Sequence, residues 1–243
     1  MRLIFLFFFS IGLAYGQSGQ ELAVGYADRY DSLPEIHIEI AEKQLYERTA
    51  PAPKMIFSHF AIKNNTLIVP TGKGLIKLKK FDDSPRQDDG FRGWQYMGYL
   101  PRLQMHALVS HSVSEHLGFS DMVLLDSATS DQYGIVSIGD ATVSLPIHSP
   151  DGRFLAYYYN HVYERNSCFI GLLEIRDGMI SSHARISEMA SFQTKNWAVE
   201  DIRWVDNTSL IVKTYILKGR GVLEERQYKY YLARLNSAIK KTE

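Results

Sequence analysis

The residues most capable of chemistry are His111, Glu115 and His116, which lie close together in the chain. Imidazole nitrogens and carboxylate oxygens bind zinc, and the same groups move protons in general acid–base catalysis. The spacing does not match His-Glu-x-x-His, and His106 would point to the opposite face of a strand from His111. We therefore interpret these side chains as polar residues flanking a hairpin loop at 112–114. They predict no metal site and no cofactor.

Two other patterns also fall short of a known site. The stretch Gly118–Asp121 contains a serine but lacks the second glycine of Gly-x-Ser-x-Gly, the signature of an exposed nucleophile. The acidic run at 82–89 does not match the spacing of a calcium-binding loop, so we expect a solvated acidic loop. No catalytic residue is predicted.

Aromatic side chains cluster at 94–96, 157–159 and 228–231. Cross-strand packing accounts for most aromatics in a sheet, but exposed ones stack on sugars or anchor a partner protein. Trp94 and Tyr158, together with His111, Glu115 and His116, are therefore the candidate ligand or partner surface. A protein or a glycan would fit it.

The rest of the chain, from residue 17 onward, consists of short apolar runs separated by turn residues. Clear turns lie at 63–66, 149–152 and 205–208, where Asn, Asp and Gly tolerate positive φ angles. A strand-like run follows each of them at once, and helical periodicity is scarce. This pattern predicts an antiparallel all-β protein.

The turns and runs recur in about four degenerate units, at roughly 57–98, 99–141, 147–190 and 199–235. Units of this length built from short strands are typical of propeller blades. The stretch Ser149–Tyr157 resembles the blade signature of WD40-like (SPDG-type) periplasmic β-propellers. We expect four blade-like antiparallel sheets in an open or incomplete propeller, with a curved β-sandwich as the alternative. Through 98–101, 149–152 and 199–207 the chain also resembles uncharacterised exported proteins of Bacteroidetes-type bacteria.

The N-terminus has the pattern of a cleavable export signal at residues 1–16. Arg2 precedes an apolar run from Leu3 to Leu13, and the small residues Ala14 and Gly16 follow. The run is shorter than the roughly 20 residues that span a bilayer, and no cysteine follows it for lipid attachment. We expect a soluble periplasmic or extracellular product without a membrane span, with a flexible lead-in at 17–35 and a single β domain at 36–243.

Charge and cysteine content narrow the function further. Lys and Arg number 27, as do Asp and Glu, and this balance argues against a general electrostatic partner such as nucleic acid or an anionic membrane surface. Cys168 is the single cysteine, so no internal disulfide can form, and its apolar neighbours predict a buried side chain. The favoured function is an exported, non-enzymatic binding or scaffold domain. The alternative is an extracytoplasmic hydrolase, or its accessory domain, acting on peptide or glycan.

Overall fold

The computed structural model describes residues 19–24, 32–52, 55–56, 61–82, 90–136, 139, 141–176, 185–219 and 224–235. The predicted export signal at 1–16 and most of the acidic run at 82–89 lie outside them. Nearly every described element is a β-strand, and α1 (Lys43–Arg48) is a short helix. Among the described residues, no helix has the length and apolar content needed to cross a membrane.

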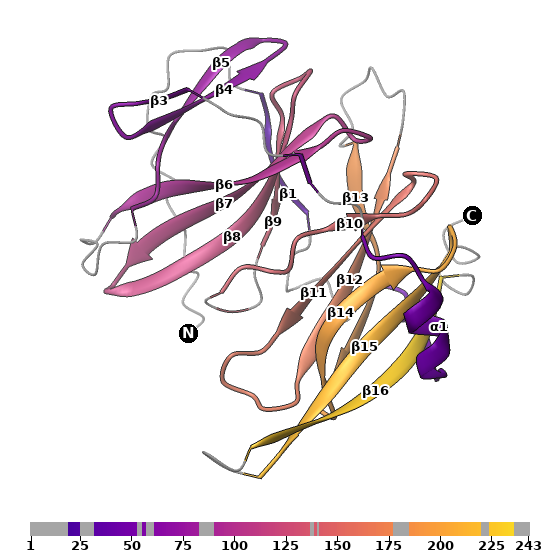
Figure 1. The fold of residues 1–243 in the computed structure, drawn as a ribbon. Coiled ribbons are helices and arrows are strands. Elements are labelled where there is room, and N and C mark those ends of the chain that lie inside the picture. The colour runs from indigo at the N-terminus through magenta and orange to yellow at the C-terminus, as the bar shows by residue number, and fades with distance from the viewer. Residues whose placement is uncertain are drawn as a thin grey trace, which may run out of the picture.

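The described strands form four separate sheets (Figure 1). Sheet I contains, in spatial order, β3 (Ala61–Lys63), β4 (Thr66–Thr71) and β5 (Gly74–Lys79). Sheet II contains β1 (Glu21–Val24), β9 (Gln132–Ile135), β8 (Leu117–Asp126), β7 (Met105–Ser114) and β6 (Arg92–Leu100).

Sheet III contains β10 (Ile147–His148), β11 (Phe154–Asn160), β12 (Cys168–Ile175) and β13 (Ile186–Thr194). Sheet IV contains β14 (Ala198–Trp204), β15 (Ser209–Lys218), β16 (Glu225–Arg234) and β2 (His37–Ile40). Antiparallel pairing predominates, and the predicted all-β arrangement of four blade-like sheets is confirmed.

The predicted units at 147–190 and 199–235 match sheets III and IV to within a few residues, but the boundary between the first two units was wrong. The unit at 57–98 assigned residues 92–98 to the first sheet, whereas β6 pairs with β7 in sheet II. Trp94 and Tyr96 explain the error, because their side chains pack on the core shared with sheet I while their backbone bonds to sheet II.

Three apolar cores join the sheets in the order I–II–III–IV. Leu67 and Val69 of sheet I pack with Leu108 of sheet II. A larger core joins sheets II and III, and a third joins sheets III and IV. The middle sheets are therefore buried on both faces, which is why β12 reads as an almost unbroken apolar run.

The turns behave as their residue types predict. Asn64 and Asn65 both adopt positive φ angles, as a two-residue hairpin turn requires. In the turn at 149–152 the buried Ser149 hydroxyl donates to the Asp151 carboxylate and accepts the Phe154 amide. The Asp151 amide in turn donates to Asn207 Oδ1 at 3.0 Å, which links this turn to the turn at 205–208.

Cys168 lies in the core between sheets III and IV with no exposed surface, as predicted. Burial raises the pKa of its thiol, so the reactive thiolate is disfavoured.

Two described segments before α1, one of them within the lead-in expected at 17–35, pair with the sheets. The residues 20–24 and 34–41, which we call the N-terminal strap, bond to the last strand of three successive sheets. β1 pairs with β9 in sheet II, Ser191 of β13 exchanges backbone bonds with Pro34 and Ile36, and β2 pairs with β16 in sheet IV. An open sheet edge carries unpaired backbone groups, and the strap satisfies them.

Two isoleucines of the strap test how much it contributes to stability. Ile36 is 1% exposed and packs in the core between sheets III and IV, whereas Ile40 is 82% exposed. We expect Ile36→Ala to lower the free energy of unfolding by about 2–5 kcal/mol, and Ile40→Ala to change it by about 0.5 kcal/mol at most. Urea denaturation followed by circular dichroism measures both. Similar values for the two variants would show that the strap is not anchored at Ile36.

Candidate functional site

The predicted polar cluster on β7 and β8 does not converge. Glu115 and His116, and not residues 112–114, form the hairpin turn, with φ angles of 53° and 64°. His111 is paired with Ser120, three ladder positions from the pair that closes the turn. At about 3.3 Å per residue, His111 lies roughly 10 Å or more from the turn. Within the described part of the chain, no group of three metal-ligating side chains is present.

His111 instead has two polar neighbours from adjacent strands. Ser120 Oγ lies 3.0 Å from its Nδ1, and Gln95 Oε1 lies 3.4 Å from its Nε2. An amide oxygen only accepts, so it favours the tautomer with a proton on Nε2 and leaves Nδ1 to accept from the serine hydroxyl. The Phe81 ring stacks on the imidazole at 3.8 Å between centroids. The Ser120 hydroxyl therefore lies beside the His111 imidazole, whose orientation is set by Gln95 and Phe81.

Trp94 and Tyr158 lie elsewhere. Trp94 packs against the core between sheets I and II, and Tyr158 packs against the core between sheets III and IV. The five predicted site residues thus occupy three places: the β7–β8 hairpin, the first core and the third core. They do not form one surface.

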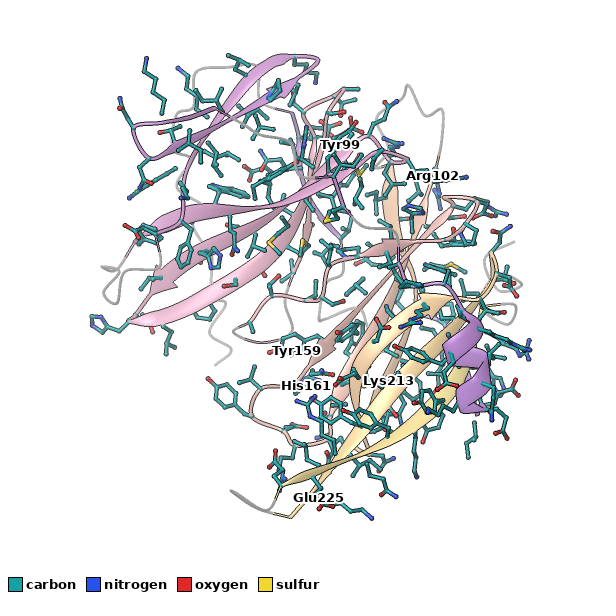
Figure 2. The ribbon with its side chains drawn as sticks, viewed as in Figure 1. Tyr99, Arg102, Tyr159, His161, Lys213 and Glu225 are labelled. Atoms are coloured by element: carbon teal, nitrogen blue, oxygen red, sulfur yellow. The ribbon has the colours of Figure 1, made fainter. Side chains whose placement is uncertain are left out.

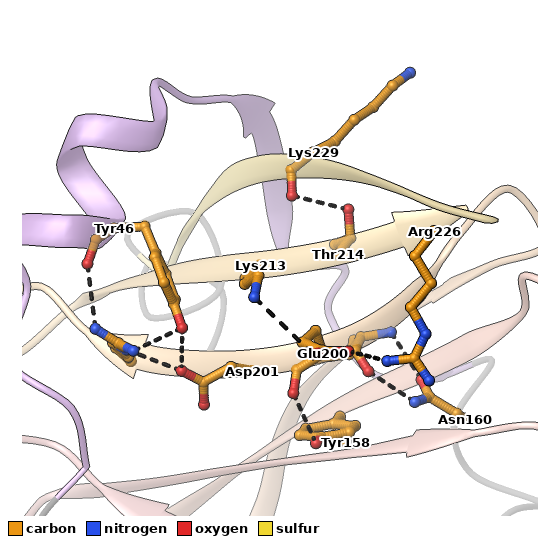
Figure 3. A network of polar contacts seen from close by, with 11 residues as sticks. Tyr46, Tyr158, Asn160, Glu200, Asp201, Lys213, Thr214, Arg226 and Lys229 are labelled. Atoms are coloured by element: carbon orange, nitrogen blue, oxygen red, sulfur yellow. Dashed lines mark hydrogen bonds and ion pairs between the residues drawn. The ribbon is translucent and has the colours of Figure 1, made fainter. Parts of the chain in front are cut away.

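A surface that was not predicted as a unit lies on the outer face of sheet IV, and Figure 3 shows the polar network around its Tyr46, Lys213 and Arg226. Tyr215 pairs directly with Tyr228, and Lys213 pairs directly with Tyr230, so all four side chains share one face. The tyrosine surface consists of Tyr46, Tyr215, Tyr228, Tyr230, Lys213 and Arg226. Lys213 lies midway along β15, and Glu225 lies at the far end of the β15–β16 hairpin (Figure 2).

Cations lie over the rings of this surface. The Lys213 ammonium is 4.4 Å from the centre of the Tyr228 ring, and the Arg226 guanidinium is 4.5 Å from the Tyr215 ring. Glu200 joins the two cations, because its carboxylate lies 2.8 Å from Arg226 and 4.0 Å from Lys213. The cations are thus balanced by a carboxylate and held over the rings.

Arg203 fixes α1 against this face. Its guanidinium donates to the backbone oxygens of Tyr46 and Thr49, to the Tyr46 hydroxyl and to the Asp201 carboxylate. The Tyr46 hydroxyl also donates to Asp201 at 2.7 Å. Burial and that bond to Asp201 raise the pKa of Tyr46 to about 12, so the phenol stays neutral and donates.

Side chains of sheet III hold the part of β14 that carries Glu200. A bulge in β14 between Val199 and Asp201 inserts Glu200. The Asn160 side chain both donates to and accepts from the Val199 backbone at 2.8 Å. The Tyr158 hydroxyl donates to the Glu200 carbonyl at 3.5 Å, and burial raises the pKa of this phenol. Tyr158 therefore positions the bulge and is not itself the exposed contact.

Comparison with known proteins identifies no family. No family model matches the chain, and no curated protein matches it. Among solved structures, a crystal structure of a puromycin hydrolase mutant complexed with PGG is similar, with a TM-score of 0.38 and 17% identity. The match covers 68% of this chain and 27% of that chain, so this chain spans only about a quarter of the length of that protein. We base no argument on a likeness of this size.

A pair of Arg→Lys substitutions tests the role of Arg203. Lysine keeps the charge but has no planar fork, so Arg203→Lys leaves acceptors near α1 without donors. We expect a loss of about 1–3 kcal/mol in the free energy of unfolding and faster amide exchange in Lys43–Thr49. Arg234→Lys is the control, because Arg234 and Glu39 form an ion pair in which both side chains are 46% exposed. There we expect about 0–1 kcal/mol. Equal losses of stability in the two variants would show that Arg203 does not hold α1 against sheet IV.

Proposed function

We propose that the chain is an exported, non-enzymatic binding module that contacts a partner protein through the tyrosine surface. The observation that supports this proposal is the exposure of Tyr228 and Arg226 within an ordered network, at 42% and 48% respectively. Tyrosine and arginine are enriched among the residues that dominate binding energy at protein interfaces.

The cations favour a protein over a glycan. Sugars stack on the open face of an aromatic ring, but Lys213 and Arg226 each cover one face of a ring here. Arg203 covers the Tyr46 ring in the same way, at 3.9 Å from its centre. Three ring faces of this surface are therefore already occupied by cations, whereas tyrosine at a contact with a protein does not need an open ring face.

The network also lowers the cost of binding. Side chains that are already fixed lose little conformational entropy when a partner arrives. Tyr215 and Tyr228 are held by strand register, and Arg226 is held between Glu200 and the Tyr215 ring. The surface is therefore preorganised for binding.

Photo-crosslinking tests this function. A photoreactive phenylalanine analogue at position 228 should give a discrete crosslinked product in envelope extract, and the same analogue at position 163 should not. Tyr163 is the matched control, because it is 84% exposed and lies on the loop that joins β11 to β12. Arg226→Ala should reduce the crosslinked product at position 228 roughly tenfold or more, as expected of a dominant contact. Identical products from positions 228 and 163 would contradict the proposal.

A second candidate function rests on Ser120 and His111. We infer that a serine hydroxyl 3.0 Å from an imidazole nitrogen, with an amide on the other nitrogen, could act as a nucleophile activated by a base. This arrangement favours the alternative of a hydrolase that forms an ester intermediate on the serine.

A fluorophosphonate probe distinguishes the two functions. If Ser120 is activated, its Oγ forms a bond to phosphorus as fluoride leaves, and the wild-type chain becomes labelled. His111→Gln should abolish labelling because it removes the base. His116→Gln is the control, since His116 lies in the hairpin turn away from Ser120. Wild-type protein that stays unlabelled would exclude an activated serine.

A further inference from the structure

Sheet I carries a local excess of positive charge in a chain that is neutral overall. Residues 61–81 include lysines but no aspartate or glutamate, whereas the whole chain has 27 cationic and 27 acidic residues. These lysines are all exposed: Lys63, Lys73, Lys77, Lys79 and Lys80. The neutral total therefore conceals a cationic segment at 61–81, which the acidic run at 82–89 follows.

Strand register gathers three of these lysines on one face. Leu67 and Leu78 pair with each other and point into the core shared with sheet II. The alternate positions point away from that core, because side chains alternate along a strand. Lys63 and Lys79 both pair with Thr66, and Lys77 pairs with Ile68, so these lysines lie on the outer face. We call this surface, with Leu75, the lysine face.

The lysine face also has an apolar part. Leu75 is 58% exposed and pairs with Pro70, which is itself exposed. Leu75 lies two positions from Lys77 on β5, so both side chains project from the same face. Ile68, between them and β3, is half-buried. Cationic and apolar groups are therefore adjacent on one open face.

The three lysines of this face form no ion pair within the described part of the chain, although the acidic run at 82–89 follows β5 in the sequence. The ion pairs found among the described residues involve neither Lys63 nor Lys77 nor Lys79. The Lys79 ammonium lies 4.6 Å from the centre of the Phe91 ring, a contact that leaves its charge in place. The face thus retains a positive potential that attracts an anionic partner.

We propose that the lysine face binds the surface of a bilayer that contains anionic phospholipid. Lysines spread over neighbouring strands suit a layer of charged headgroups, because each acts as a point charge on a flexible stem. Leu75 favours a bilayer over other anionic partners. Burial of its side chain at the boundary between headgroups and acyl chains lowers the free energy of binding. A hydrated polysaccharide or a nucleic acid offers no such apolar environment. This peripheral attachment does not depend on the tyrosine surface.

The position of the lysine face gives the proposal a structural consequence. The cores order the sheets I–II–III–IV, so the lysine face and the tyrosine surface belong to the first and last sheets of the row (Figure 1). Attachment through sheet I would leave the outer face of sheet IV open to a partner protein.

Vesicle co-sedimentation tests the proposal with the chain from Gln17 onward, which keeps every described residue and removes the apolar N-terminal run. Binding to vesicles that contain phosphatidylglycerol is expected, with little binding to pure phosphatidylcholine and release at raised salt. The triple variant Lys63→Gln, Lys77→Gln, Lys79→Gln should bind roughly 100-fold more weakly, since each lysine near an anionic surface contributes about fivefold. Circular dichroism checks that the variant is folded.

The matched control removes the same charge elsewhere. Lys195, Lys218 and Lys229 are exposed and lie outside sheet I, and their triple Lys→Gln variant should bind almost as well as the wild type. Leu75→Ser should weaken vesicle binding several-fold but leave binding to dextran sulfate unchanged. The proposal is overturned if the wild type does not bind vesicles, if both triple variants lose binding equally, or if dextran sulfate alone is bound.

Discussion

The packing of each middle sheet against neighbours on both faces is the constraint on which the rest of the structure depends. Leu155 and Tyr157 of β11 face the core with sheet II, while Phe154 and Ala156 face the core with sheet IV. Because side chains alternate along a strand, a slip of one residue would exchange the two sets and disrupt both cores. Register in sheet III therefore positions everything attached to it, including the bulge that inserts Glu200 and, through it, the cations of the tyrosine surface.

Much of the fold could be predicted from local patterns, because turns and apolar runs are local properties. Asn64 and Asn65 tolerate positive φ angles, and Ser149 and Asp151 bond the backbone of their own turn, so both turns were predictable. Membership of a sheet is not local. The apolar pattern of a strand reports which core its side chains face and says nothing about which strand accepts its backbone bonds, and for this reason β6 was assigned to the wrong unit.

The candidate sites were less predictable, because they depend on register between strands distant in sequence. The tyrosines at 228–231 were noted as a cluster, but their partners come from β15 and from α1. No local signal indicates that Tyr46 approaches Tyr230, with 5.4 Å between ring centres. Ser120 was examined as part of an incomplete motif, whereas its contact with His111 follows from ladder pairing. Whole-chain charge is likewise not a local property, since a zero sum does not describe the lysines gathered on sheet I.

The N-terminal strap has a consequence for the order of folding. Its contacts span large sequence separations: Gln20 bonds to Asp131, and Glu39 bonds to Arg234 across 195 residues. The strap is synthesised before every strand that it pairs with, and the strand that pairs with β2 is among the last to be made. Closing such long loops is slow, and the strap cannot finish pairing on an incomplete chain. Final closure is therefore a late event that requires the entire polypeptide, and until then the outer edges of sheets II, III and IV stay unprotected.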